Sequence, residues 1–157
     1  MNEEWEIILG RLKPEGRLSR DDYFMEIAQT VSKRGTCPRL AVGAIVVDGR
    51  NRILGTGYNG SPPGHPHCHD VGCCLIMVGD KQYCIRSIHA EVNALLTVET
   101  SADILIMYST HKPCFECIKV IVAKGITVIK YREEYRDPKW ERIQDEYSKR
   151  LTFQRIQ

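Results

Sequence analysis

The chain has 157 residues, of which 43% are hydrophobic and 27% are charged, and this balance is ordinary for one globular domain with its own core. A formal net charge of +2 is too small for a polyanion-binding surface, so no nucleic-acid partner is expected. The sequence has no apolar run near the ~20 residues of a membrane span, and its acidic start is unlike a secretory signal, so we expect a cytoplasmic protein without a membrane partner.

The first elements in chain order are two predicted helices. Residues 1–18 carry apolar side chains at helical spacing, which predicts a short N-terminal helical extension before the main domain at 19–157. Ser19, with Asp22 three residues later, resembles a capping box at the start of the second helix. That helix is expected to end near Gly35.

A hairpin and a long insertion follow. The β-branched run 41–47 and the segment 53–58, joined by a turn, predict two paired strands. Residues 59–86 show no convincing periodicity and are rich in Gly, Pro, His and Cys. A connection of this length without secondary structure is unusual in a compact domain, and we therefore expect an irregular insertion that serves a function or is tied down internally.

The rest of the chain alternates between helical and strand patterns. Together with the hairpin, this alternation predicts an α/β fold, a three-layer α/β/α sandwich around a mixed five-stranded sheet. The expected elements are a helix at 89–98, a strand at 104–108, a helix at 114–124, a strand at 126–131, a helix from 138 to about 150 and a strand at 151–156.

Two short segments contain residue types suited to metal binding. His89 and Glu91 stand at the start of one predicted helix, and Cys114 and Cys117 stand at the start of the next. One histidine and two cysteine thiolates supply the three protein ligands of a catalytic zinc site with one open position. Cysteines three residues apart on a helix point the same way, and a helix N-terminus favours thiolates. Glu91 points in another direction and can approach a water on the metal without binding the metal.

Each of these residues has a plainer explanation when taken alone. A bare C-x-x-C pair is also typical of redox sites or of small buried hydrophobic residues. A lone histidine is more often a core or capping residue, and a lone glutamate more often belongs to a solvated helix face. The joint occurrence of both segments, each after a loop and at a helix start, favours the zinc centre.

The combined pattern H-x-E…P-C-x-x-C resembles the signature of zinc-dependent nucleobase deaminases. The resemblance implies a zinc ion that lowers the pKa of a water from about 15.7 toward about 7, giving a hydroxide that attacks C4 of cytosine. Glu91 is then expected to carry protons from the water to N3 of the ring and to the departing ammonia. The backbone near Ala90 is expected to hydrogen-bond the base.

Within this signature, the chain resembles the deoxycytidylate (dCMP) deaminase family over about residues 20–135. The zinc motifs are common to all cytidine-deaminase-like enzymes, whereas the Gly-Tyr-Asn-Gly segment favours the nucleotide enzymes. The resemblance implies hydrolysis of dCMP to dUMP and ammonia, which supplies dUMP for thymidylate synthesis. The matching segments, in the order of that family, are Thr36-Cys37-Pro38-Arg39, Gly57-Tyr58-Asn59-Gly60, Ile88-His89-Ala90-Glu91-Val92-Asn93-Ala94 and Pro113-Cys114-Phe115-Glu116-Cys117.

The resemblance also implies which residues bind the substrate. Asn59 matches an asparagine that lines the nucleotide pocket and is expected to hydrogen-bond the sugar. By its position, Arg39 is the best candidate for the 5′-phosphate, because a planar guanidinium matches phosphate oxygens in a bidentate way. The alternative is that Arg39 is an exposed, solubilising charge. Lys112 and Tyr131 are weaker candidates.

Regulation is implied in the same way. Many members of the family are homohexamers that dCTP activates and dTTP inhibits, so a homo-oligomer is expected here, with Mg²⁺ accompanying a nucleotide effector. Gly57, Tyr58 and Gly60 are the candidates for the effector site, and simple turn chemistry is the alternative for the two glycines. After the catalytic helix the chain has Thr97-Val98-Glu99-Thr100, where some relatives carry an arginine, and this departure weakens the expectation of regulation.

The remaining cysteines predict a second, structural zinc. Some relatives carry one between the first helix and the insertion, and clustered cysteines in a reducing compartment are typical of metal sites. Such a metal would order an otherwise irregular insertion. Reduced, partly buried cysteines are the alternative. The expected ligands are Cys37, Cys68, Cys73 and Cys84, with Cys74 as a substitute for Cys73 and with His65, His67 or His69 able to take one position.

Three other functions were weighed against dCMP deamination. A tRNA adenosine deaminase shares the zinc motifs, but neither the charge balance nor any Lys/Arg run favours an RNA surface. A free cytidine deaminase is disfavoured by the Gly-Tyr-Asn-Gly segment. A non-catalytic, zinc-stabilised binding module would need the metal ligands but would have no use for Glu91.

Overall fold

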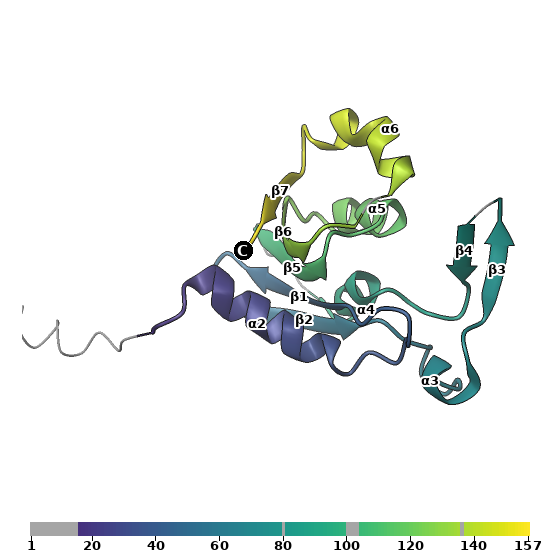
Figure 1. The fold of residues 1–157 in the computed structure, drawn as a ribbon. Coiled ribbons are helices and arrows are strands. Elements are labelled where there is room, and N and C mark those ends of the chain that lie inside the picture. Colours follow the sequence, from purple (N-terminus) through teal and green to yellow (C-terminus); the bar gives the residue numbers. More distant parts are fainter. Residues whose placement is uncertain (1–15, 80, 100–103, 136) are drawn as a thin grey trace, which may run out of the picture.

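The computed structural model describes residues 16–79, 81–99, 104–135 and 137–157 (Figure 1). Most of the predicted N-terminal extension at 1–18 lies outside these residues. None of the helices in the described ranges combines the length and the apolar character needed to cross a membrane.

The centre of the fold is a five-stranded mixed sheet in the order β2-β1-β5-β6-β7. Strand β1 pairs antiparallel with both β2 and β5, while β5, β6 and β7 run parallel to one another. This arrangement confirms the predicted mixed sheet. The strands are β1 (Gly43–Asp48), β2 (Ile53–Tyr58), β5 (Leu105–His111), β6 (Val128–Glu133) and β7 (Thr152–Arg155).

Helices cover both faces of the sheet and complete the predicted sandwich (Figure 1). All of β1 is buried, and its side chains alternate between the two faces. Ile45 and Val47 pack with α2 (Arg20–Ser32) on one face. Ala44 and Val46 belong to the larger core on the other face, which is built with α4 (Ala90–Leu96), α5 (Phe115–Ala123) and α6 (Pro138–Tyr147).

Local signals set the starts of these helices. Ser19 caps α2 as predicted, since its side chain accepts a hydrogen bond of 3.1 Å from the backbone N–H of Asp22. Asp137 caps α6 in the same way and accepts from the backbone N–H of Lys139 at 3.0 Å. Pro138 follows that cap in the first turn, where a missing N–H costs nothing.

Gly57 fixes how closely the helix α4 approaches the sheet. A Cβ atom on Gly57 would lie 2.2 Å from the backbone nitrogen of Ala94 and 2.3 Å from the carbonyl oxygen of Ala90. Only glycine therefore allows β2 and α4 to lie this close together. The side chain of Asn93 adds to this contact by donating a 2.8 Å hydrogen bond to the carbonyl of Tyr58.

The prediction of an irregular insertion at 59–86 is wrong. The segment contains a short helix α3 (Cys68–Val71) and an antiparallel hairpin of β3 (Leu75–Val78) with β4 (Lys81–Cys84). All four residues of β3 are exposed, so the strand has no alternation between a buried and a solvated face. Without that alternation the sequence pattern carries no strand signal. The hairpin stands apart from the central sheet (Figure 1).

Candidate metal centre and active site

The three predicted zinc ligands meet where α4 and α5 begin. His89 is the N-cap residue of α4, Cys114 is the N-cap residue of α5, and Cys117 lies in the first turn of α5. The Nδ1 atom of His89 is 3.2 Å from the Sγ atom of Cys117 and 3.4 Å from that of Cys114. The two sulfur atoms are 3.6 Å apart.

These separations fit a tetrahedral zinc ion. Bonds of about 2.3 Å to sulfur and about 2.0 Å to nitrogen place N and S atoms about 3.5 Å apart and two S atoms about 3.8 Å apart. The three side chains therefore need to move by only a few tenths of an ångström to hold the metal. Among the described His, Cys, Asp and Glu residues, these three form the group whose ligand atoms all lie within 4.8 Å of one another.

The electrostatics of the group also suit a cation. The contacts of Cys114 with the Cys117 sulfur and with the His89 imidazole lower the pKa of Cys114 to about 4. In turn, the hydrogen bond to Cys114 raises the pKa of His89 to about 9. Cys114 is thus held as a thiolate, which is the form that binds zinc.

Glu91 lies beside the ligands without joining them. Its side chain is 4% exposed, and its two carboxylate oxygens accept hydrogen bonds from Ser109 Oγ at 3.4 Å and from Cys117 Sγ at 3.6 Å. Burial raises the pKa of Glu91 above its ordinary value. A buried carboxylate with a raised pKa, next to a metal site, is suited to accepting and returning a proton.

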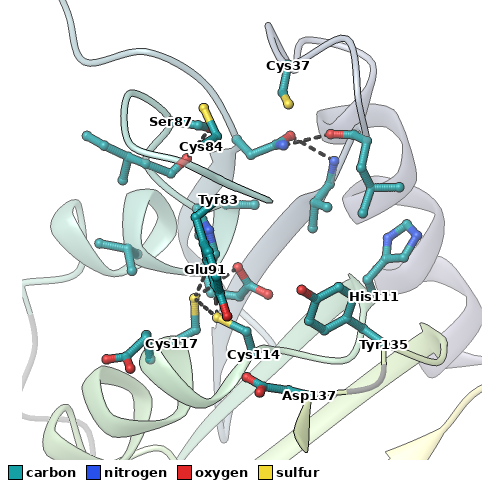
Figure 2. Close-up of a pocket in the computed structure, with 18 of the residues that line it drawn as sticks. Cys37, Tyr83, Cys84, Ser87, Glu91, His111, Cys114, Cys117, Tyr135 and Asp137 are labelled. Carbon is teal, nitrogen blue, oxygen red and sulfur yellow. Dashed lines mark hydrogen bonds between the residues drawn. The ribbon is translucent and has the colours of Figure 1, made fainter. Parts of the chain in front are cut away.

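A cavity of ≈ 910 Å³ opens above these residues (Figure 2). His89, Glu91, Cys114 and Cys117 line it together with side chains from the loops around the carboxyl ends of the strands and from the insertion. This volume is in the range of small-molecule sites. The arrangement can therefore present a small molecule to a metal and to a proton-transferring carboxylate.

The three predicted substrate-binding residues also line this cavity: Arg39, Asn59 and Ala90. Asn59 is buried, and its amide holds the neighbouring loop in place. Its Oδ1 accepts from the backbone N–H of Val42 at 2.9 Å, and its Nδ2 donates to the carbonyl of Leu40 at 2.7 Å. The position of the asparagine in the pocket is thus fixed by its own backbone contacts.

The other candidates from the sequence lie differently. Lys112 lines the cavity, but its ammonium group is 3.5 Å from a carboxylate oxygen of Glu134. The Tyr131 hydroxyl donates to Glu134 at 2.5 Å, which is a structural contact. Among the residues that line this cavity, Gly57, Tyr58 and Gly60 are not found. Gly57 serves helix packing instead, and a Cβ on Gly60 would lie 2.4 Å from Thr36 Oγ1.

The four cysteines of the predicted second site lie close enough for Cys37, Cys68 and Cys84 to influence the pKa of Cys73, but among the described residues no three of their sulfur atoms lie within 4.8 Å of one another. Burial raises the pKa of Cys73, and the nearby thiols of Cys37, Cys68 and Cys84 raise it further. Cys37 and Cys68 are buried. Cys74 is half-buried, and His65, His67 and His69 are exposed.

Several residues at the site carry no motif and were missed by the sequence analysis. Tyr83, His111 and Tyr135 line the cavity (Figure 2). Asp137 also lines it, and its Oδ2 accepts a 2.8 Å hydrogen bond from the backbone N–H of Phe115, which fixes the start of α5 against the β6–α6 loop. The one available signal was Asp137-Pro138, which marks a helix start but not a site.

A family profile described as the cytidine and deoxycytidylate deaminase zinc-binding region matches residues 18–133. The chain belongs to this family. Relatives of this chain occur in bacteria and in phages. ComE operon protein 2 of Bacillus subtilis is 43% identical over 123 residues, which cover 76% of this chain and 62% of the relative. The chain thus spans less than two thirds of that protein's length.

Two phage proteins match this member of the deaminase family over nearly their whole length. The deoxycytidylate deaminase of Mycobacterium phage D29 is 38% identical over 124 residues, which cover 73% of this chain and 94% of the phage protein. The crystal structure of the dCMP deaminase from cyanophage S-TIM5 in complex with dCMP and dUMP aligns with a TM-score of 0.70 and 31% identity. It covers 92% of this chain and 99% of the phage chain.

Proposed function

We propose that this chain deaminates dCMP by hydrolysis, giving dUMP and ammonia. The observation that carries the proposal is the buried Glu91 carboxylate beside three zinc ligands, at the floor of a cavity large enough for a nucleotide. A structural zinc module has no use for that carboxylate. The names of the D29 relative and of the S-TIM5 structure support dCMP as the substrate.

The described residues account for the proton transfers. A zinc ion held by His89, Cys114 and Cys117 would act as a Lewis acid on the attacking water. Glu91 accepts a proton from this water and passes it to N3 while the water oxygen bonds to C4. Glu91 then takes the second proton of that oxygen and delivers it to the amino group, which leaves as ammonia. The Ser109 hydroxyl orients the carboxylate by donating to it.

We propose Arg39 as the residue that binds the 5′-phosphate. Four cationic side chains from Lys or Arg line the cavity, and three of them already have carboxylate partners. Lys112 pairs with Glu134, while Lys119 and Lys139 both pair with Glu116. Arg39 is exposed and has no ion-pair partner among the described residues. Its guanidinium is therefore available to a phosphate. Asn59 is proposed to contact the sugar, and the backbone near Ala90 is proposed to contact the base.

This assignment predicts the substrate preference. Wild-type protein is expected to deaminate dCMP with a kcat/KM at least about 10²-fold above that for deoxycytidine, because a polar site penalises a substrate that lacks its partner. Arg39→Ala is expected to remove most of this preference by lowering kcat/KM for dCMP and leaving the value for deoxycytidine unchanged. Ammonia release from dCMP, CMP, deoxycytidine and dCTP, measured in parallel, checks both expectations. Equal kcat/KM for nucleotide and nucleoside in the wild type would contradict the assignment.

We also propose a second, structural zinc at the four cysteines Cys37, Cys68, Cys73 and Cys84. The proposal is supported by cysteines from three separate segments of the chain, since Cys37, Cys68 and Cys84 all influence the pKa of Cys73. Burial works to raise the pKa of Cys84, but hydrogen bonds from the backbone N–H groups of Arg86 and Ser87 and from Cys68 lower it overall. N–H groups aimed at a sulfur stabilise the thiolate, which is the metal-binding form.

Metal analysis tests the second site. Wild-type protein is expected to contain two zinc ions per chain, and the double variant Cys68→Ser/Cys84→Ser is expected to contain one. Cys74→Ser is compared with Cys73→Ser, because the two residues are alternatives for the same ligand position. Loss of one zinc ion in Cys73→Ser but not in Cys74→Ser is the expected result. A wild-type protein that is fully active with one zinc per chain would rule out the second site.

Other expectations from the family resemblance stay predictions. These are a homohexamer, activation by dCTP, inhibition by dTTP, Mg²⁺ bound with an effector, a cytoplasmic location and a single domain at 19–157. The packing roles of Gly57 and Gly60 are sufficient to explain both glycines without an effector.

A further inference from the structure

Hydrogen bonds connect the two ends of the β3–β4 hairpin at its base. The backbone N–H of Ile85 donates to the carbonyl of Cys74 at 3.0 Å, and the side chain of Arg86 donates to the carbonyl of Gly72 at the same distance. Just beyond the hairpin, Gly60 and Ile88 exchange two backbone hydrogen bonds of 2.8 and 3.1 Å. These bonds connect the hairpin to the end of β2 and fix its position relative to the cavity.

Three residues of this hairpin line the cavity, namely Gln82, Tyr83 and Cys84, and Tyr83 is the aromatic one. Tyr83 in β4 lines the cavity, and in the view of Figure 2 its ring projects across the opening in front of Glu91 and Cys114. Tyr135 also lines the cavity, where burial raises its pKa and Cys114, Asp137 and Tyr83 add to this rise. Tyr83 and Tyr135 therefore face the same volume from different segments. The mechanism above does not use Tyr83.

The exposure of this ring indicates what it could contact. Tyr83 is 40% exposed although it lies at the mouth of a cavity, so a large aromatic surface is available to a bound molecule. Flat nucleobases bind to aromatic faces by stacking, and such a stack is worth ~1–3 kcal/mol per base. The floor of the cavity provides the metal ligands and Glu91, whereas the hairpin provides a wall.

We propose that Tyr83 is a substrate-binding residue and that the pyrimidine ring stacks against it while its reactive carbon faces Glu91. The inserted hairpin then forms one wall of the active site. This inference rests on the proposed function, because it takes the substrate to be a cytosine compound. Tyr83 and Arg39 then bind different parts of the substrate: Tyr83 contacts the pyrimidine ring and Arg39 contacts the phosphate.

The test compares Tyr83→Ala, Tyr83→Phe and wild type on dCMP and on deoxycytidine. Loss of one stacking contact is expected to raise KM by ~5- to 100-fold in Tyr83→Ala, with kcat changed by less than about 3-fold, because binding is lost equally in ground and transition states. The rise is expected to be the same for both substrates, since they share the ring. Tyr83→Phe keeps the ring and is expected to stay within about 2-fold of wild type.

Met77→Ala is the control for the hairpin itself. Met77 is 60% exposed in β3 and is absent from the cavity lining, so its KM is expected to equal that of wild type. Unchanged kinetics in Tyr83→Ala would overturn the inference. An equal loss in Tyr83→Phe, or in Met77→Ala, would overturn it as well, since the effect would then belong to the hydroxyl or to the hairpin fold.

Failure of the proposed function gives a different result. If wild-type protein deaminates deoxycytidine or CMP but not dCMP, the proposed substrate is wrong. Wild type, Tyr83→Ala and Tyr83→Phe are then compared on the compound that the wild type deaminates, because it carries the same ring. If no cytosine compound is deaminated by zinc-loaded wild type, the proposed function and the role of Tyr83 are both wrong.

Discussion

Replacing Glu91 with glutamine is expected to lower kcat on dCMP by at least ~10²–10⁴-fold while the protein keeps its zinc and its fold. The amide has nearly the same shape as the carboxylate and can still accept a hydrogen bond from Ser109, but it cannot take up and return protons. Glutamine is also neutral, so burying its side chain at this position costs less free energy than burying a charged carboxylate. Steady-state ammonia release, zinc content and circular dichroism of the purified variant measure the three properties.

Glu133→Gln provides the matched control for this experiment. Glu133 is exposed at the end of β6 and does not line the cavity, so the same chemical change there is expected to leave kcat within about 2-fold of wild type. A Glu91→Gln protein with wild-type turnover would show that another group transfers the protons. Loss of zinc in Glu91→Gln would instead show that this carboxylate supports the metal site.

Much of the central fold could be predicted from the sequence because its signals are local. Strand β1 is a β-branched run and was found within two residues of its observed bounds. Helix α2 starts after its predicted capping serine but ends at Ser32, three residues before the predicted end near Gly35. Boundaries were less certain where the pattern continues past a structural end. The strand predicted at 104–108 extends to His111, because β5 keeps its pairing with β6 up to that residue.

The insertion could not be predicted for a physical reason. Its strands are four residues each, and β3 is exposed along its whole length, so hydrophobic burial does not determine them. Their position depends on backbone hydrogen bonds at the base of the hairpin and between Gly60 and Ile88. The hydrophobic pattern of a sequence indicates which residues are buried and where turns occur, but it does not indicate which segments contact one another.

The same distinction applies to the active site. His89, Glu91, Cys114 and Cys117 could be predicted to lie together because the chemistry of zinc and proton transfer requires these residue types at short, fixed spacings, and the structure brings them together at the cavity. Tyr83 comes from an isolated hairpin, and Tyr135 and Asp137 come from a loop after the last motif, so no spacing connects them to the metal ligands. Only the fold brings those three residues to the cavity.

The second large effect is expected for Cys114→Ala, which should lose one zinc ion per chain and all measurable deaminase activity. With only two protein ligands left, the zinc ion would have to fill two coordination positions with water, and the site would bind it too weakly to keep it. Cys114 is the better position for this test than Cys117. Cys114 is half-buried and its side chain makes no capping hydrogen bond, whereas Cys117 is 2% exposed and belongs to the core.

Reconstitution separates loss of the metal from loss of the fold. Wild-type protein stripped with a chelator is expected to recover its activity when zinc is added back, whereas Cys114→Ala is expected to stay inactive at the same zinc concentration. Its circular dichroism spectrum should match that of the stripped wild type, since truncating a half-buried side chain at a helix start leaves the core packing intact. A Cys114→Ala protein that kept the full zinc content and turned over dCMP would remove Cys114 from the ligand set, and His89 and Cys117 would then need another partner in the cavity.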